Sequence, residues 1–259
     1  MIRTLLIIAA AALVLAIVAI GGAFALGGSD LKQNGWTWTF VNDEGRHGGV
    51  RGGPSEPAPQ ISRTLAWTGR ESLTVAAPVH VTYVPGDEAG VSITGPRDVV
   101  ERLELRDGVL DFDRSLDRDR VTVSWSNGSL RAWSDADAVR VVVTAPNVRR
   151  FDLDGSGEIH IRDYDQDVLA LSITGSGEIE ATGRTARLTV DVTGSGEAEL
   201  AALRTDDVEV DLSGSGDVTV APTGAATVQI SGSGDVTLAT RPRTLAQDIT
   251  GSGEVHQRY

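Results

Sequence analysis

The chain has 259 residues, of which 41% are hydrophobic and 5% aromatic, and its formal net charge at pH 7 is -13. This acidic chain contains 22 arginines but only one lysine, Lys32, and has no basic cluster, which argues against nucleic acid or anionic lipid headgroups as partners. The absence of cysteine excludes disulfide bonds, thiolate metal sites, a cysteine nucleophile and a lipid-modified cysteine.

An apolar run near the start of the chain predicts export. Residues 4–26 carry no charge and follow Arg3. About 20 apolar residues span a bilayer, whereas the apolar part of a cleaved signal peptide has about 7–15. We therefore expect residues 1–28 to be a membrane anchor, one transmembrane helix, with a signal peptide cleaved after Ala25 as the alternative. Positive charge before the run places the rest of the chain outside the cytoplasm, in the periplasm or exterior if anchored and secreted if cleaved.

Residues 29–60 are expected to link the anchor to a folded domain. Within them, Trp36–Phe40 alternates aromatic residues with threonine, which is typical of a short strand or of an aromatic belt at a membrane surface. Residues 42–60 are rich in glycine, proline and charge without periodicity, which predicts a flexible tether.

Residues 61–148 show short alternating runs bounded by turn residues, which predicts an irregular, all-β lead-in to a more regular domain. The one helix candidate is Asp98–Asp107, which could equally be a strand, and Asp111–Arg120 is expected to be a solvated loop of mixed charge. The expected strands are Ser72–Ala76, Val79–Val84, Val91–Thr94, Val109–Phe112, Val121–Trp125 and Val139–Thr144.

Residues 149–259 contain a tetrapeptide, Gly-Ser-Gly followed by Glu or Asp, that recurs every 18 to 20 residues. That period is too short for a domain and fits one coil of a β-solenoid. The fold is therefore predicted to be an all-β solenoid. The six copies begin at Gly155, Gly175, Gly194, Gly214, Gly232 and Gly251.

Residues at even distances from the first glycine of each copy are mostly aliphatic. Because side chains alternate along a strand, these positions are expected to face inward and to stack as ladders from coil to coil. The glycines share that parity, so they are expected to face inward or to form the bend. The serines and the acids are then expected to face outward.

The outward acids form one predicted column, and stacked like charges repel each other. Bound Ca²⁺ could relieve the repulsion, although separated acids screened by salt are the simpler interpretation. These weak cation-ladder candidates are Glu158, Glu178, Glu197, Asp217, Asp235 and Glu254.

The last copy departs from the pattern, because Gln247 and Gln257 stand where other copies have apolar residues. Terminal repeats are often atypical because they cap the stack. The alternative is that this coil contacts a partner or forms an oligomer.

The repeats, the apolar N-terminal run and the sequence Val141–Pro146 resemble the head GIN domain family, whose members are described as auto-transporter adhesins. The likeness covers about residues 61–257. It implies a single domain with a right-handed parallel β-helix-like fold on a cell-envelope protein. It implies no catalytic residues, because the family has no established activity.

No residue pattern predicts catalysis. His47, His80, His160 and His256 share no metal-ligand spacing and are interpreted as exposed residues, and Gly-Ser-Gly-acid lacks the context of a nucleophile elbow or a phosphate loop. The segment from Asp163 to Asp167 interrupts the repeat and is interpreted as a surface loop, with a carbohydrate or cation site as the alternative. The predicted function is a non-enzymatic, membrane-tethered binding, adhesin-like or structural module that contacts an envelope protein or polysaccharide. The alternative is a carbohydrate-active or cation-dependent carbohydrate-binding protein, since β-helices can carry pairs of catalytic carboxylates.

Overall fold

The computed structural model describes residues 36–41, 50–53, 59–69, 71–113, 120–126, 129–134 and 138–259, with side chains in 59–69, 71–113 and 138–259. The expected anchor, residues 4–26, and His47 lie outside these ranges. Within them, no helix is long and apolar enough to cross a membrane.

The chain divides into two compact units: Met1–Pro57 with Asp117–Ser134, and Ala58–Leu116 with Asp135–Tyr259. The first contains an antiparallel sheet in the order β10-β9-β1-β2. The segment with alternating aromatics forms β1, and β2 lies within the region expected to be a tether. The strands are β1 (Trp36–Val41), β2 (Val50–Gly53), β9 (Arg120–Ser126) and β10 (Ser129–Ser134).

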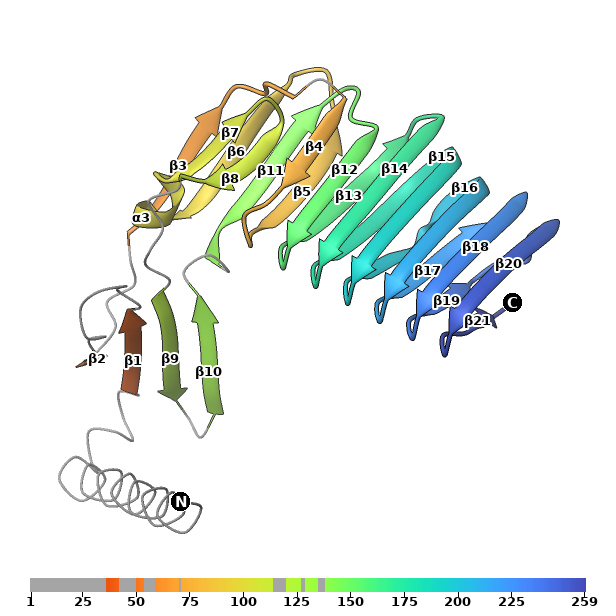
Figure 1. The fold of residues 1–259 in the computed structure, drawn as a ribbon. Coiled ribbons are helices and arrows are strands. Elements are labelled where there is room, and N and C mark those ends of the chain that lie inside the picture. Colours follow the sequence, from red (N-terminus) through yellow and green to blue (C-terminus); the bar gives the residue numbers. More distant parts are fainter. Residues whose placement is uncertain are drawn as a thin grey trace, which may run out of the picture. The chain divides into compact units, whose positions relative to one another are not determined.

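The second unit is the predicted all-β solenoid (Figure 1). Each coil has one strand before the Gly-Ser-Gly bend and one after it, and successive coils pair in parallel. The strands that end at the bend form what we call the leading stack, and those that begin at the motif acid form the trailing stack. The repeating strands are β12 (Arg150–Gly155), β13 (Glu158–Asp165), β14 (Val168–Gly175), β15 (Glu178–Gly194), β16 (Glu197–Gly214), β17 (Asp217–Pro222), β18 (Ala225–Gly232), β19 (Asp235–Leu238), β20 (Thr244–Gly251) and β21 (Val255–Gln257).

The register between coils follows the sequence repeat. In the leading stack, Gly155 pairs with Gly175, and that glycine pairs with Gly194. In the trailing stack, Ile159 pairs with Ile179. Strands β15 and β16 are long enough to belong to both stacks, one half in each.

The lead-in extends both stacks at their N-terminal end. β4 (Ser72–Val75) pairs in parallel with β12, and β5 (His80–Pro85) pairs in parallel with β13, so these two strands form a coil without the glycine motif. β11 (Arg140–Ala145) lies between β5 and β6 (Gly90–Pro96). It pairs in parallel with β5 and antiparallel with β6.

The N-terminal end is then closed by antiparallel pairs. β3 (Gln60–Leu65) pairs with β6, and β7 (Leu103–Arg106) forms a hairpin with β8 (Val109–Phe112), which also pairs with β4. The helix candidate resolves into both of its alternatives, a one-turn helix, α3 (Arg97–Val100), followed by β7.

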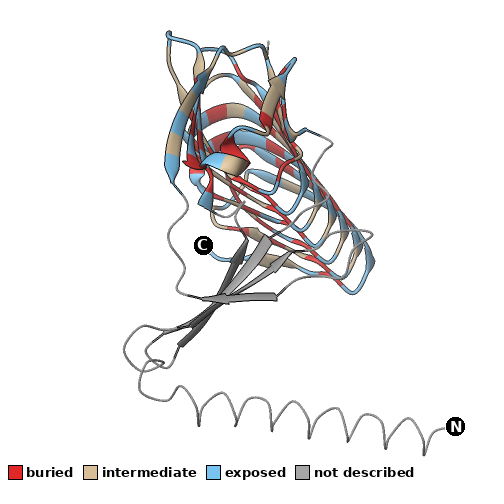
Figure 2. Cartoon of the chain, turned by 90° about the vertical axis from the view of Figure 1, so that its left-hand side faces the viewer, coloured by how far each residue is buried: buried red, intermediate tan, exposed pale blue. Residues whose placement is uncertain are grey.

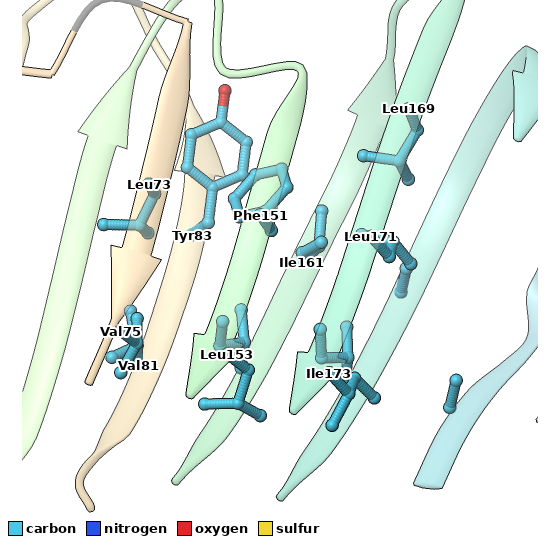
Figure 3. Close-up of a cluster of buried hydrophobic side chains, with 14 of the residues drawn as sticks. Leu73, Val75, Val81, Tyr83, Phe151, Leu153, Ile161, Leu169, Leu171 and Ile173 are labelled. Carbon is cyan, nitrogen blue, oxygen red and sulfur yellow. The ribbon is translucent and has the colours of Figure 1, made fainter. Parts of the chain in front are cut away.

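The predicted inward ladders form the core between the two stacks (Figures 2 and 3). In the first five motif copies, the aliphatic or aromatic residues at the four even positions around the bend are buried. The pattern fails in the last coil, where Gln247 is exposed and Ile249 is 36% exposed.

Candidate functional site

The Gly-Ser-Gly bend is a structural element. Its first glycine has a φ of +106° to +137°, a region that side-chain-bearing residues rarely adopt. Its second glycine is buried, and a Cβ on Gly216 would lie 2.3 Å from the carbonyl oxygen of Gly196 in the preceding coil. The motif serine is exposed, and in successive coils its backbone N–H donates to the first glycine's carbonyl of the coil before, as from Ser215 to Gly194 at 2.8 Å. The motif therefore lets coils approach closely.

The motif acids occupy one outward column of the trailing stack, which we call the acid column. Their backbone positions are in register from Glu158 to Asp235, each acid paired with the next. The backbone N–H of Glu254 donates to Oδ1 of Asp235 at 2.9 Å, which continues the column into the last coil. The predicted stacking of like charges is thus present.

Glu178, on the acid column, is partly buried and has several carboxylates as neighbours. Partial burial raises the pKa of Glu178, and the neighbouring carboxylates Glu197, Glu158 and Glu180 raise it further, while His160 lowers it. A raised pKa means that the folded chain binds a proton at Glu178 more readily than the unfolded chain does.

Two histidines stand at the N-terminal end of the acid column. His80, on β5, pairs in register with Glu158 and so occupies the column's next position. Nδ1 of His80 contacts Oε2 of Glu158, Nε2 of His160 contacts Oε1 of the same carboxylate, and Nδ1 of His160 lies 2.7 Å from Oε2 of Glu180. Glu158 is therefore flanked by two imidazoles.

The interpretation of these histidines as merely exposed residues was wrong. Each is at least partly covered and lies against a carboxylate, and His256 similarly lies 3.5 Å from Oδ2 of Asp235. The repeat could not reveal the role of His80, because its coil has Ala77–Pro78–Val79 instead of Gly-Ser-Gly. Only the pairing of β5 with β13 places it in the column.

The acid column does not form a metal centre in the residues that the structure describes. Across residues 59–69, 71–113 and 138–259, no group of three or more His, Asp or Glu side chains is placed to hold a metal ion.

A shallow hollow lies beside the head of the acid column. It has a volume of about 160 Å³ and is lined by the bends of three successive coils, including Pro78, Ser156 and Ser176, together with His80, Glu158 and Glu178. Pockets for small organic ligands usually measure about 300–1,000 Å³. The hollow is too small to enclose a sugar or a cofactor.

The leading stack carries a second outward row of acids, but it is interrupted. Asp191 pairs in register with Asp211, and burial, followed by the charge of Asp211, raises the pKa of Asp191. Ser172 and Gln229 stand in this row at other coils, and Nε of Arg150 donates to Oδ1 of Asp152 at 3.0 Å. The acid column on the trailing stack is longer and more continuous.

The segment Asp163–Asp167 is a structural interruption. Tyr164 is buried and its hydroxyl donates to the carbonyl of Val168 at 2.6 Å, so the prediction of a surface loop was wrong for this residue. Asp165 accepts two hydrogen bonds from Arg184, at 2.6 and 2.9 Å. The side chains of Tyr164 and Asp165 are therefore already engaged in internal contacts.

Replacing Glu178 with glutamine is expected to stabilise the protein at pH 7 by about 0.5 kcal/mol, because it removes a partly buried charge and the repulsion from the neighbouring carboxylates. The gain is full above the raised pKa of Glu178 and disappears as pH falls below the ordinary glutamate value of 4.5, where the wild-type side chain is protonated in both states. Urea denaturation at pH 7 and pH 4 measures this. An equal effect at both pH values would contradict the electrostatic cause, and Thr219→Val, on the same face, controls for a change of surface polarity.

Proteins of known sequence or structure resemble this chain. The family model described as "Putative auto-transporter adhesin, head GIN domain" matches residues 71–242. A "putative adhesin" from Bacteroides fragilis has the same fold at 17% identity and a TM-score of 0.56, covering 77% of this chain and 97% of its own. A "putative lipid binding protein" from Parabacteroides distasonis matches at 18% identity and a TM-score of 0.45, covering 76% and 96%. No curated protein sequence matches the chain.

Proposed function

The chain belongs to the head GIN domain family, and on that premise we propose that it is a non-enzymatic binding module of the cell envelope whose trailing stack holds a positively charged partner. The observation that carries the proposal is the acid column, which runs in register along the trailing stack. Such a row of charges attracts a cationic, extended partner and orients it along the column.

A binding role is favoured over catalysis by the distribution of the acids. An active site requires two or more groups that converge on a reacting atom, with a cleft that excludes water. Here the carboxylates are repeated from coil to coil, and the hollow beside Glu158 is small. A flat, repeated surface suits a polymer or an extended peptide, such as a basic segment of an envelope protein or a polysaccharide that carries amino groups.

We further propose that residues 4–26 anchor the module in the cytoplasmic membrane, with the solenoid in the periplasm or at the exterior. The apolar length of this segment supports the proposal. Extraction of membranes with alkaline carbonate tests it: the chain should remain with the membrane, and recovery in the soluble fraction would contradict an uncleaved anchor.

The binding face is tested by two matched triple variants of the full chain. In the first, Glu178→Gln, Glu197→Gln and Asp217→Asn neutralise the centre of the acid column. In the second, Asp152→Asn, Asp191→Asn and Asp211→Asn remove the same number of charges from the leading stack.

Binding of a fluorescent oligolysine peptide and of amino-bearing polysaccharide fragments is measured for each protein by anisotropy. We expect affinity to fall about five- to tenfold in the first variant, since each exposed charge pair contributes ~0.2–1 kcal/mol. The second variant should change affinity by less than half as much. Equal losses in both variants would show attraction to net charge alone and would contradict a defined face.

A further inference from the structure

The two ends of the solenoid differ. At the N-terminal end, antiparallel strands and α3 close the stacks. At the C-terminal end, among the described residues, β20 pairs only with β18 and β21 only with β19 (Figure 1). β20 therefore presents an open edge, along which the N–H and C=O groups of every second residue have no neighbouring strand to pair with.

The side chains at this open end do not prevent the edge from pairing with a further strand. The inward positions of β20 are identified by their pairing with the buried residues Ala226, Val228 and Ile230 of β18. Those positions hold Leu245, Gln247 and Ile249, and the equivalent positions of β21 hold Val255 and Gln257. None carries a charge, although inward charges, lysine and proline are the usual devices that prevent edge pairing.

We propose that the C-terminal coil pairs with the same coil of a second copy of this chain, so that two solenoids join end to end about a two-fold axis. The axis is perpendicular to the sheets, and β20 runs antiparallel to β20 of the other copy. The self-complementary chemistry of the end supports a second copy: a glutamine amide both donates and accepts, so it can bond to an identical amide.

The alternation of side chains restricts the register of this pairing. Inward residues must lie opposite inward residues, because a shift of one residue would turn the apolar positions of one copy outward. The two longest registers that satisfy this condition centre on Gln247 or on Asp248. Centring on Asp248 would place two carboxylates directly opposite each other, which is destabilising.

Centring on Gln247 instead gives favourable neighbours. Leu245 of each copy then lies opposite Ile249 of the other, so the two partly exposed apolar side chains continue the core across the interface. On the outward face of the paired strands, Thr244 of one copy lies opposite Thr250 of the other, and Ala246 lies opposite Asp248. Gln247 and Gln257 are equally distant from Ser252 along the coil, so an axis through one passes near the other.

The register is tested by single cysteines, since the natural chain has none. Gln247→Cys places two thiols opposite each other at about 4.5–5.5 Å between Cβ atoms, close to disulfide distance. Gln229→Cys is the matched control, because that glutamine is exposed on the outward side of β18, one coil away. After mild oxidation of the full chain, we expect a cross-linked dimer from the first variant and not from the second. Equal cross-linking in both would overturn the proposal.

The association itself is tested by analytical ultracentrifugation of the full chain in detergent. We expect a dimer for the wild type, and a dissociation constant raised on the order of tenfold or more in Gln247→Lys, where two charges meet on the axis. Gln229→Lys adds the same charge and should leave the dimer intact. A monomeric wild type, an open-ended polymer, or equal effects of the two lysines would each overturn the proposal. Circular dichroism confirms that both variants are folded.

Discussion

Replacing Gly214 with alanine is expected to lower the free energy of unfolding by about 3 kcal/mol or more, the sum of backbone strain and overpacking. Gly214 has a φ of +127°, and a Cβ there would lie 2.2 Å from the carbonyl oxygen of Gly194 in the coil before. That oxygen accepts the backbone N–H of Ser215 at 2.8 Å, so it cannot move away without loss of the bond between coils.

Gly155 provides the matched control, because it has the same place in the motif but no coil with the motif beneath it. Its φ is +106°, and a Cβ there would meet nothing within 4 Å. Gly155→Ala should therefore cost only backbone strain, about 1–3 kcal/mol. Urea denaturation followed by circular dichroism compares the two midpoints. Equal losses would show that the conformation of the bend, and not the contact between coils, requires glycine.

Gly155 and Gly214 have the same place in the motif but different neighbours, and this contrast shows which features of the structure the sequence could predict. The period and the alternation around the bend predicted the solenoid, the inward ladders and the outward acids, because each depends on local spacing that repeats. The alternative roles of glycine, bend or narrow interior, were both found, one at each glycine of the motif. Local pattern was sufficient where every coil has the same neighbours.

Contacts between distant segments could not be predicted in this way. The pairing of β1 with β9 joins a segment that precedes residues 61–148 to a segment within them, and no spacing rule connects the two. The pairing of His80 with Glu158 crosses a gap of 78 residues. The sequence of β5 alone does not show which distant strand it pairs with. The position of His80 at the N-terminal end of the acid column is therefore known only from the strand pairing in the structure.

The same limit applies to the two faces of the solenoid. The spacing of the motif predicted one outward acid per coil on the trailing strands. Whether the row of acids is more continuous on the trailing or on the leading stack depends on which residues pair between coils. Arg150 holds Asp152 on the leading side, whereas the trailing column keeps its charges in sequence from coil to coil. The cationic partner proposed above would neutralise this repulsion on binding.

Replacing Phe151 with alanine is expected to lower the free energy of unfolding by about 3–5 kcal/mol, the usual cost of removing a buried phenylalanine. Phe151 is fully buried on β12, at the position that the next coils fill with leucine or valine, as at Leu171 and Val190. Its ring meets that of Tyr83 edge to face, with 5.0 Å between centroids (Figure 3). The hydroxyl of Tyr83 donates to the carbonyl of Ala145 at 2.8 Å, so this pair links the first regular coil to β5 and β11 of the lead-in.

Phe151→Leu is the matched variant, because leucine occupies the same position at Leu171 in the next coil. If the ring is needed only for its volume, leucine should recover most of the loss and cost less than about 1.5 kcal/mol. If the ring pair is needed, a double-mutant cycle with Tyr83→Leu should show a coupling of about 0.5–1.5 kcal/mol. A single cooperative urea transition in the wild type that separates into two in Phe151→Ala would show that this contact couples the lead-in to the repeats. Each coil of a solenoid is held only by the coils beside it, so loss of this contact should weaken the junction between the lead-in and the repeats. Retention of one transition with full stability would contradict that role.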